Sequence, residues 1–183
     1  MHDATAAPRS SAAWWAETKA DPARLLAWLF AQYRGEVTAA QRIARLRDAH
    51  ATPGSRAYRL LTAIAGQERD HAEWVGALLQ ARGHAPAVVG PAEARYWRAT
   101  LPGIDDLETG CAVGAHAEAM RLARIEAIAG DTTAPADIRA VFARILPQER
   151  FHERAFRSLA TPASLAATRG AHELGRAVLG LEA

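Results

Sequence analysis

The chain has little cysteine, and this excludes several kinds of site. Cys111 is the single cysteine among 183 residues. One thiol cannot form an internal disulfide, a zinc knuckle or a four-thiolate iron centre. We therefore expect a reducing, cytoplasmic location.

Long apolar runs are also missing. No stretch approaches the roughly 20 uninterrupted apolar residues that a membrane-spanning helix needs. The first residues lack the basic segment and apolar segment of an export signal. We expect a protein that neither spans a membrane nor is exported.

Neither positive nor negative charge is present in large excess. The formal net charge is only +2, Lys19 is the single lysine, and the arginines are scattered without forming a basic run. Solvated helix faces explain such a distribution, whereas a nucleic-acid surface needs clustered positive charge. We expect no nucleic-acid partner.

What the sequence does contain is a series of long helices separated by proline and glycine. Asp21-Pro22 starts the first, Ser55 caps the second before its end at Arg82, and Thr161-Pro162 starts the last. The expected helices are 22–49, 55–82, 104–129, 135–159 and 162–179. Residues 83–103 predict a long connection with one short helical piece.

Half of the residues are apolar, which is enough for one domain of ordinary size. We expect a single domain over 1–183, with a bundle core at 22–159. An N-terminal arm, 1–21, and a C-terminal helix, 162–179, would flank that core. The fold class that follows is all-α.

The apolar stripe of each long helix is interrupted by acid. In the helix after Ser55, Glu68 and His71 take two positions of the apolar stripe, and in the fourth helix Glu149 and His152 do the same. The two other long helices each carry one glutamate in the stripe, and these are Glu36 and Glu118.

Spacing predicts that these acids meet. In an antiparallel hairpin, residues equidistant from the turn lie at the same height. The mean of 36 and 68 is 52, within the turn Thr52-Pro53-Gly54, and the mean of 118 and 149 is 133.5, within the turn 132–135. A Glu and a His at i and i+3 lie one helical turn apart on the same face.

Four carboxylates in one core favour a bound metal. A buried unpaired carboxylate costs several kcal/mol or becomes protonated, and two divalent cations would cancel four negative charges. Carboxylate and imidazole ligands suit iron or manganese. A metal-free network of buried Glu-His hydrogen bonds, in a protein that serves only as an interaction module, is the alternative.

The pattern E, ExxH, E, ExxH on four helices resembles the ferritin-like di-iron carboxylate superfamily, which includes bacterioferritins, rubrerythrins and O₂-activating oxygenases. The resemblance covers residues 22–159. It implies two antiparallel hairpins joined by a long crossover between the second and third helices. It also implies two iron ions, with Glu68 and Glu149 as bridging ligands; the full ligand set would be Glu36, Glu68, His71, Glu118, Glu149 and His152.

The sequence departs from the family pattern at several positions, and these limit which members of the family it resembles. Arg121 stands one turn after Glu118, where rubrerythrins typically carry a further glutamate near the site. The missing thiolates exclude a complete rubrerythrin. Gln67 and Gln148 precede the ExxH glutamates, where many di-iron oxygenases have an acid, so the sequence leaves the partners of the histidines unassigned.

Two further features admit two interpretations each. Tyr33, one turn before Glu36, is either a packing residue or a catalytic residue that hydrogen-bonds a ligand or relays an electron. Small residues surround the ligand positions, and they either border a substrate cavity or allow close helix packing. They are Gly35, Ala39, Ala40, Ala65, Gly66, Ala72, Gly114, Ala115 and Ala119.

The resemblance implies a non-haem di-iron oxidoreductase that uses O₂ or H₂O₂ to oxidise a small-molecule substrate, with an electron donor that the sequence does not identify. A rubrerythrin-like peroxide reductase is one alternative. A ferritin-like protein that oxidises, stores or carries iron is another. The sequence also leaves a homodimer open.

Overall fold

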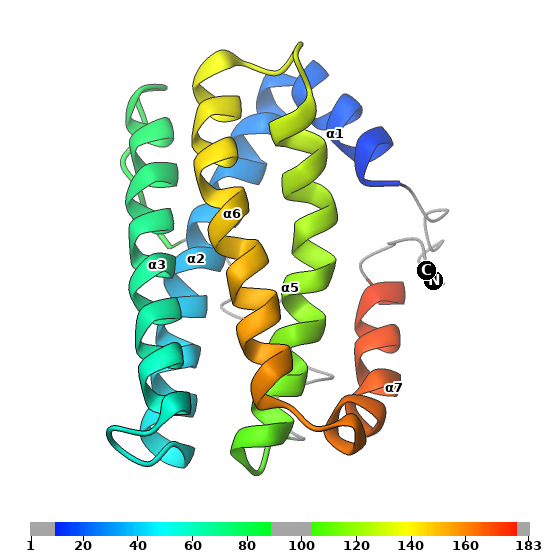
Figure 1. Ribbon diagram of the computed structural model, residues 1–183. Coiled ribbons are helices and arrows are strands. Elements are labelled where there is room, and N and C mark those ends of the chain that lie inside the picture. The colour runs from blue at the N-terminus through cyan, green and yellow to red at the C-terminus, as the bar shows by residue number, and fades with distance from the viewer. Residues whose placement is uncertain (1–9, 89–103, 179–183) are drawn as a thin grey trace, which may run out of the picture.

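A computed structural model describes residues 10–88 and 104–178, and every regular element in these ranges is a helix (Figure 1). This confirms the all-α prediction. The helices are α1 Ser11–Ala20, α2 Pro22–His50, α3 Arg56–Gln80, α5 Leu107–Gly130, α6 Ala136–Leu159 and α7 Pro162–Val178.

Side-chain caps set the helix starts. Asp21 accepts hydrogen bonds from the backbone N–H groups of Ala23 and Arg24, at 2.9 and 3.3 Å, and so begins α2 as expected. Asp106 accepts from the N–H of Thr109 at 2.7 Å. Because Asp106 is the cap, α5 begins at Leu107, three residues later than the sequence predicted.

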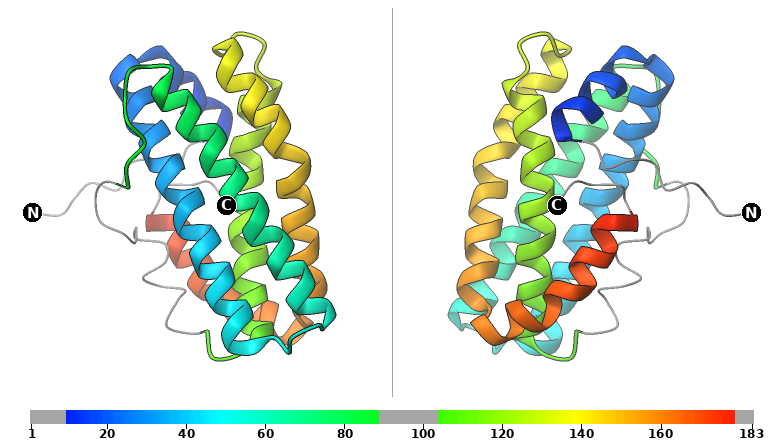
Figure 2. Two further views of the ribbon diagram at one scale, coloured as in Figure 1. Left: turned by 90° about the vertical axis from the view of Figure 1, so that its left-hand side faces the viewer. Right: turned by 90° about the vertical axis from the view of Figure 1, so that its right-hand side faces the viewer.

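Two antiparallel hairpins form the bundle, α2 with α3 and α5 with α6 (Figures 1 and 2). Helices α3 and α5 run in the same direction, which is the relative orientation that the expected crossover implies. Residues 89–103 of this connection, with the short helical piece expected there, lie outside the described residues.

The apolar core is divided into two clusters along the bundle axis. Leu29, Val75 and Phe142 belong to one cluster, and Ile43 and Leu61 to the other. On each of the four long helices, the glutamate of the interrupted stripe falls between residues of the first cluster and residues of the second. The core therefore has a polar layer at mid-height.

Helices α1 and α7 pack on the outside of the bundle, in the positions of the expected arm and C-terminal helix (Figure 1). In α1, Trp15 is buried and its indole N–H donates to Asp131 at 2.9 Å. In α7, the His172 ring stacks on His116 of α5, with ring centroids 4.8 Å apart. His116 therefore lies between α5 and α7.

In the described part of the chain, none of the helices combines the length and the apolar character needed to cross a bilayer.

Candidate metal centre

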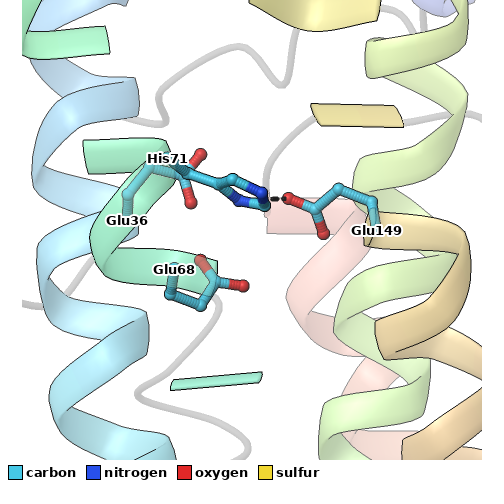
Figure 3. Close-up of side chains that lie close together, drawn as sticks. All are labelled: Glu36, Glu68, His71 and Glu149. Atoms are coloured by element: carbon cyan, nitrogen blue, oxygen red, sulfur yellow. Dashed lines mark ion pairs between the residues drawn. The ribbon is translucent and has the colours of Figure 1, made fainter. Parts of the chain in front are cut away.

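The polar layer consists of the six side chains that the sequence singled out as metal ligands. Each is at most 4% exposed. Helix α2 contributes Glu36, α3 contributes Glu68 and His71, and α6 contributes Glu149, so that the carboxylates and the imidazole point toward one another (Figure 3). The remaining two members are Glu118 of α5 and His152 of α6.

These side chains form two overlapping groups, each able to surround one ion. Glu36 and His71 complete the first group, and Glu118 and His152 complete the second. Glu68 and Glu149 belong to both groups. Within each group the candidate ligand atoms lie within 4.8 Å of one another. A carboxylate shared by both groups is placed to bridge two ions.

Glutamines of the opposite hairpin orient the two histidines. Nε2 of His71 lies 2.8 Å from Oε1 of Gln148, and Nε2 of His152 lies 2.8 Å from Oε1 of Gln67. Because an amide oxygen accepts, each Nε2 carries the proton and donates it. In a neutral ring, this leaves the lone pair of Nδ1 facing the carboxylates.

These contacts are the histidine partners that the sequence left unassigned. The signal was the repetition of glutamine before both ExxH motifs. A sequence alone does not show that each glutamine reaches across to the other hairpin, because that contact depends on how the hairpins dock.

The polar layer contains many polar atoms without a hydrogen bond. Seven buried side-chain nitrogen and oxygen atoms of this cluster have no hydrogen-bond partner among the described residues. They include both carboxylate oxygens of Glu68 and of Glu149 and the Nδ1 atoms of both histidines. Native proteins satisfy most buried polar groups, so atoms left without partners here fit bound cations.

The distances between imidazole and carboxylate support the same reading. Nδ1 of His152 is 3.2 Å from Oε1 of Glu68, and Nδ1 of His71 is 3.4 Å from Oε1 of Glu149. With the protons on Nε2 and the carboxylates ionised, lone pairs would face lone pairs across these short gaps. A cation between them removes the repulsion, and the oxygen and nitrogen donors suit iron or manganese.

Arg121 lies against the same carboxylates. Its Nη2 is 2.6 Å from Oε2 of Glu36 and 3.2 Å from Oε1 of Glu149. Its Nη1 is 3.7 Å from carboxylate oxygens of Glu68 and Glu118. The sequence placed Arg121 one turn after Glu118, but it did not indicate that the guanidinium contacts all four acids.

The surroundings lower the pKa values of two of the four glutamates and raise those of the other two. Burial raises the pKa of Glu36 and Glu149, but Arg121 and the other favourable contacts of these carboxylates together outweigh it and hold both pKa values below the ordinary value of 4.5. Burial and neighbouring carboxylates hold the pKa values of Glu68 and Glu118 well above it, despite Arg121. Without a cation, therefore, Glu68 and Glu118 keep their protons to a higher pH than a free carboxyl group does.

A cavity of about 520 Å³ lies beside the polar layer, between α2 and α5. Its walls are mainly apolar, and Glu118 and Arg121 are among the residues that line it. Gly35 and Gly114 border it, as does Ala39, whereas Ala65 and Ala115 pack in the core. Some of the small residues therefore border a cavity, others allow close helix packing, and Ala39 does both.

Tyr33 lies on the other side of α2, against α3. Its Cε2 atom is 3.4 Å from the position that a Cβ would take at Gly76. Pro86 lines the same groove. This placement favours packing over a relay to the cluster, although the catalytic role of Tyr33 stays a prediction.

Cys111 and Pro147 complete the surroundings of the site. Cys111 is fully buried, and burial raises the pKa of its thiol to about 12, so it is a packing residue. Pro147 lies inside α6, two residues before Glu149, where it removes one backbone hydrogen bond of the helix. The helix expected at 135–159 already contained this proline.

Comparison with known proteins supports the fold. No protein-family model and no curated protein matches the sequence. Among solved structures, the chain is similar to a Synechococcus protein described as having aldehyde deformylating oxygenase activity. The TM-score is 0.74 at 22% identity, and the match covers 97% of this chain and 89% of that one.

At this identity the likeness establishes the architecture. The helical bundle and a buried Glu/His cluster able to hold metal both agree with the resemblance that the sequence motifs carried. The chain has the ferritin-like helical-bundle fold expected of a di-iron carboxylate protein.

Proposed function

We propose that the chain is a non-haem di-iron oxidoreductase that uses O₂ or peroxide to oxidise a small, largely apolar substrate. The observation that carries the proposal is the set of seven buried polar atoms without hydrogen bonds, next to an apolar cavity of about 520 Å³. A metal-free structural module would have no use for either feature.

In this proposal the six polar residues hold two iron ions, with Glu68 and Glu149 contacting both. The ions would supply the electrons that reduce the oxidant. The glutamines fix the histidine rings with Nδ1 facing inward. The apolar clusters above and below the layer exclude water from the reacting groups.

The cavity favours substrate oxidation over the alternatives. Reduction of peroxide or storage of iron needs only a path for small polar species, whereas this cavity has room for an organic molecule and borders Glu118 directly. The activity named for the structural neighbour, which acts on aldehydes, makes apolar aldehydes a reasonable first class to assay.

The metal centre is tested by anaerobic loading with Fe(II), metal analysis and rapid mixing with O₂ or H₂O₂. We expect about two irons per chain and faster oxidation by O₂. Faster oxidation by H₂O₂ would favour a peroxide reductase, and uptake of many irons per chain by a large assembly would favour storage. A protein that binds no iron would refute the proposal.

The cavity is tested with Gly35→Leu. Gly35 lines the cavity and a Cβ added there meets nothing within 4 Å, so we expect the leucine side chain to extend into the cavity. We expect the variant to keep its iron and its reaction with O₂ but to lose oxidation of apolar aldehydes, alcohols or acids. Gly66→Leu is the control, because a Cβ there meets only Nη2 of Arg69, at 3.7 Å, away from the cavity.

A further inference from the structure

Arg121 links the polar layer to the cavity. Its guanidinium contacts the carboxylates, yet the side chain is 22% exposed and lines the cavity wall. Glu118, one turn earlier on α5, is also part of that wall. An anion that entered the cavity would meet Arg121 at its inner end.

Charge balance gives Arg121 a role once cations are bound. Four carboxylates carry four negative charges, and two divalent cations neutralise them. The guanidinium, which balances the carboxylates in the metal-free cluster, then adds one positive charge without a counter-ion. A buried unpaired charge is unfavourable, so the loaded site favours one additional anion.

The cavity itself is suited to an anion that carries an apolar chain. The walls include Ala39, Ile43, Val113 and Phe156. Among the described lining residues Glu118 is the one acid, against three arginines, which are Arg42, Arg45 and Arg121. Repulsion would therefore not exclude an anion, and the planar guanidinium pairs with a carboxylate through two parallel hydrogen bonds.

We propose that Arg121 is the anchor for a carboxylate head group and that the cavity accepts a monocarboxylate with an apolar chain. The inference rests on the proposed function, because Arg121 becomes available only when cations replace it beside the glutamates. It narrows the substrate class from apolar molecules in general to amphipathic acids.

Calorimetry on anaerobic, Fe(II)-loaded protein tests the proposal with three probes of equal chain length, decanoate, decanol and decanal. We expect decanoate to bind about tenfold or more tightly than the two neutral probes. In the metal-free protein, where Arg121 is paired with glutamates, this preference should disappear. Equal binding of decanoate and decanol by the loaded protein would overturn the proposal.

The variant Arg121→Gln tests whether the guanidinium or the metal ions bind the carboxylate of decanoate. The variant should lose the preference for decanoate while binding decanol as the wild type does. A variant that holds two irons and still prefers decanoate would show that the ions bind the carboxylate and that Arg121 does not anchor it. Arg45→Gln is the matched control, because Arg45 is exposed at the cavity rim.

If Arg45→Gln removed the preference and Arg121→Gln kept it, the head group would lie at the rim and the proposal would be wrong. Arg121→Lys retains the charge without the two-pronged hydrogen-bond geometry and serves if the Gln variant does not fold. We expect it to bind decanoate several-fold more weakly with decanol unchanged; unchanged decanoate binding would count against the anchor.

The proposed function is tested by different measurements, namely the iron content and the reaction with O₂, so its failure can be distinguished from failure of the anchor. A protein that holds two irons, reacts with O₂ and binds decanol as tightly as decanoate would retain the proposed function and lose the anchor.

Discussion

His71 of α3 and Gln148 of α6 lie on different hairpins, and Nε2 of the histidine donates to Oε1 of the glutamine at 2.8 Å. The hydrogen bond fixes both the tautomer and the ring orientation, so Nδ1 is directed at Glu149. His152 of α6 donates in the same way to Gln67 of α3, so each hairpin supplies one histidine and one glutamine.

Gln148→Leu should therefore lower iron affinity about 10- to 100-fold, because His71 loses the acceptor that orients it. Titration of metal-free protein with Fe(II) under anaerobic conditions measures this change. Gln41→Leu, at an exposed position of α2, is the control and should bind iron like the wild type. Equal affinity in Gln148→Leu would show that the hydrogen bond does not support a metal ligand.

Metal binding should release protons. The pKa values of Glu68 and Glu118 are held well above 4.5, mainly by burial, so the metal-free protein keeps these protons to a higher pH and must release them when the carboxylates bind a cation. Metal affinity should consequently rise with pH above 4.5. Calorimetric titrations in buffers of different ionisation enthalpy count the protons released, and a count of zero would contradict the ligand assignment.

The same two acids should make the metal-free protein less stable as pH rises. A pKa that is raised in the folded state means that the folded chain binds more protons than the unfolded chain above pH 4.5. The stabilisation is complete below 4.5 and is lost as pH rises through the raised pKa. Denaturant unfolding across this range measures the slope, and Glu68→Gln should reduce it.

Gly35 and Gly114 should respond oppositely to alanine, although both lie in helices beside the cavity. A Cβ at Gly35 meets no atom within 4 Å, so alanine gains helix propensity, worth roughly 0.5–1 kcal/mol. A Cβ at Gly114 would lie 2.8 Å from the Phe156 ring, so alanine should destabilise the fold by about 1–3 kcal/mol. Chemical denaturation of the metal-free variants checks both signs.

The packing of α7 on α5 should weaken in acid. Burial, together with nearby positive charge, lowers the pKa of His172 from 6.5 to about 4, so the folded protein binds fewer protons than the unfolded chain between these values. Stability is then lost as pH falls from about 6.5 toward 4. His172→Phe keeps a ring against His116 and should flatten this part of the pH profile; a profile identical to wild type would exclude the pair as its cause.

The ligand positions could be predicted because they depend on local periodicity. Glu68 and His71 share a helix face by spacing alone, and the turn between α2 and α3 places Glu36 at the same height. The limits of the expected helices likewise followed from caps and prolines, apart from the start of α5, whereas helix α1 was not expected within the N-terminal arm. These features need no knowledge of how distant helices pack.

The rest of the site depends on docking between hairpins. The contact of Arg121 with Glu36 joins α5 to α2, and the contact of Gln67 with His152 joins α3 to α6. Nothing in the local sequence around these residues specifies the rotation of one hairpin against the other. The volume of the cavity has the same origin, because it is the space that two helices leave between them.

The crossed hydrogen bonds of the histidines bear on how the molecule opens. Since α3 and α6 each supply the acceptor that the other's imidazole requires, a local separation of the hairpins would break both at once. Metal loading should then merge the four long helices into one cooperative unit, whose backbone amides exchange with solvent together, while α1 and α7 continue to exchange independently and faster.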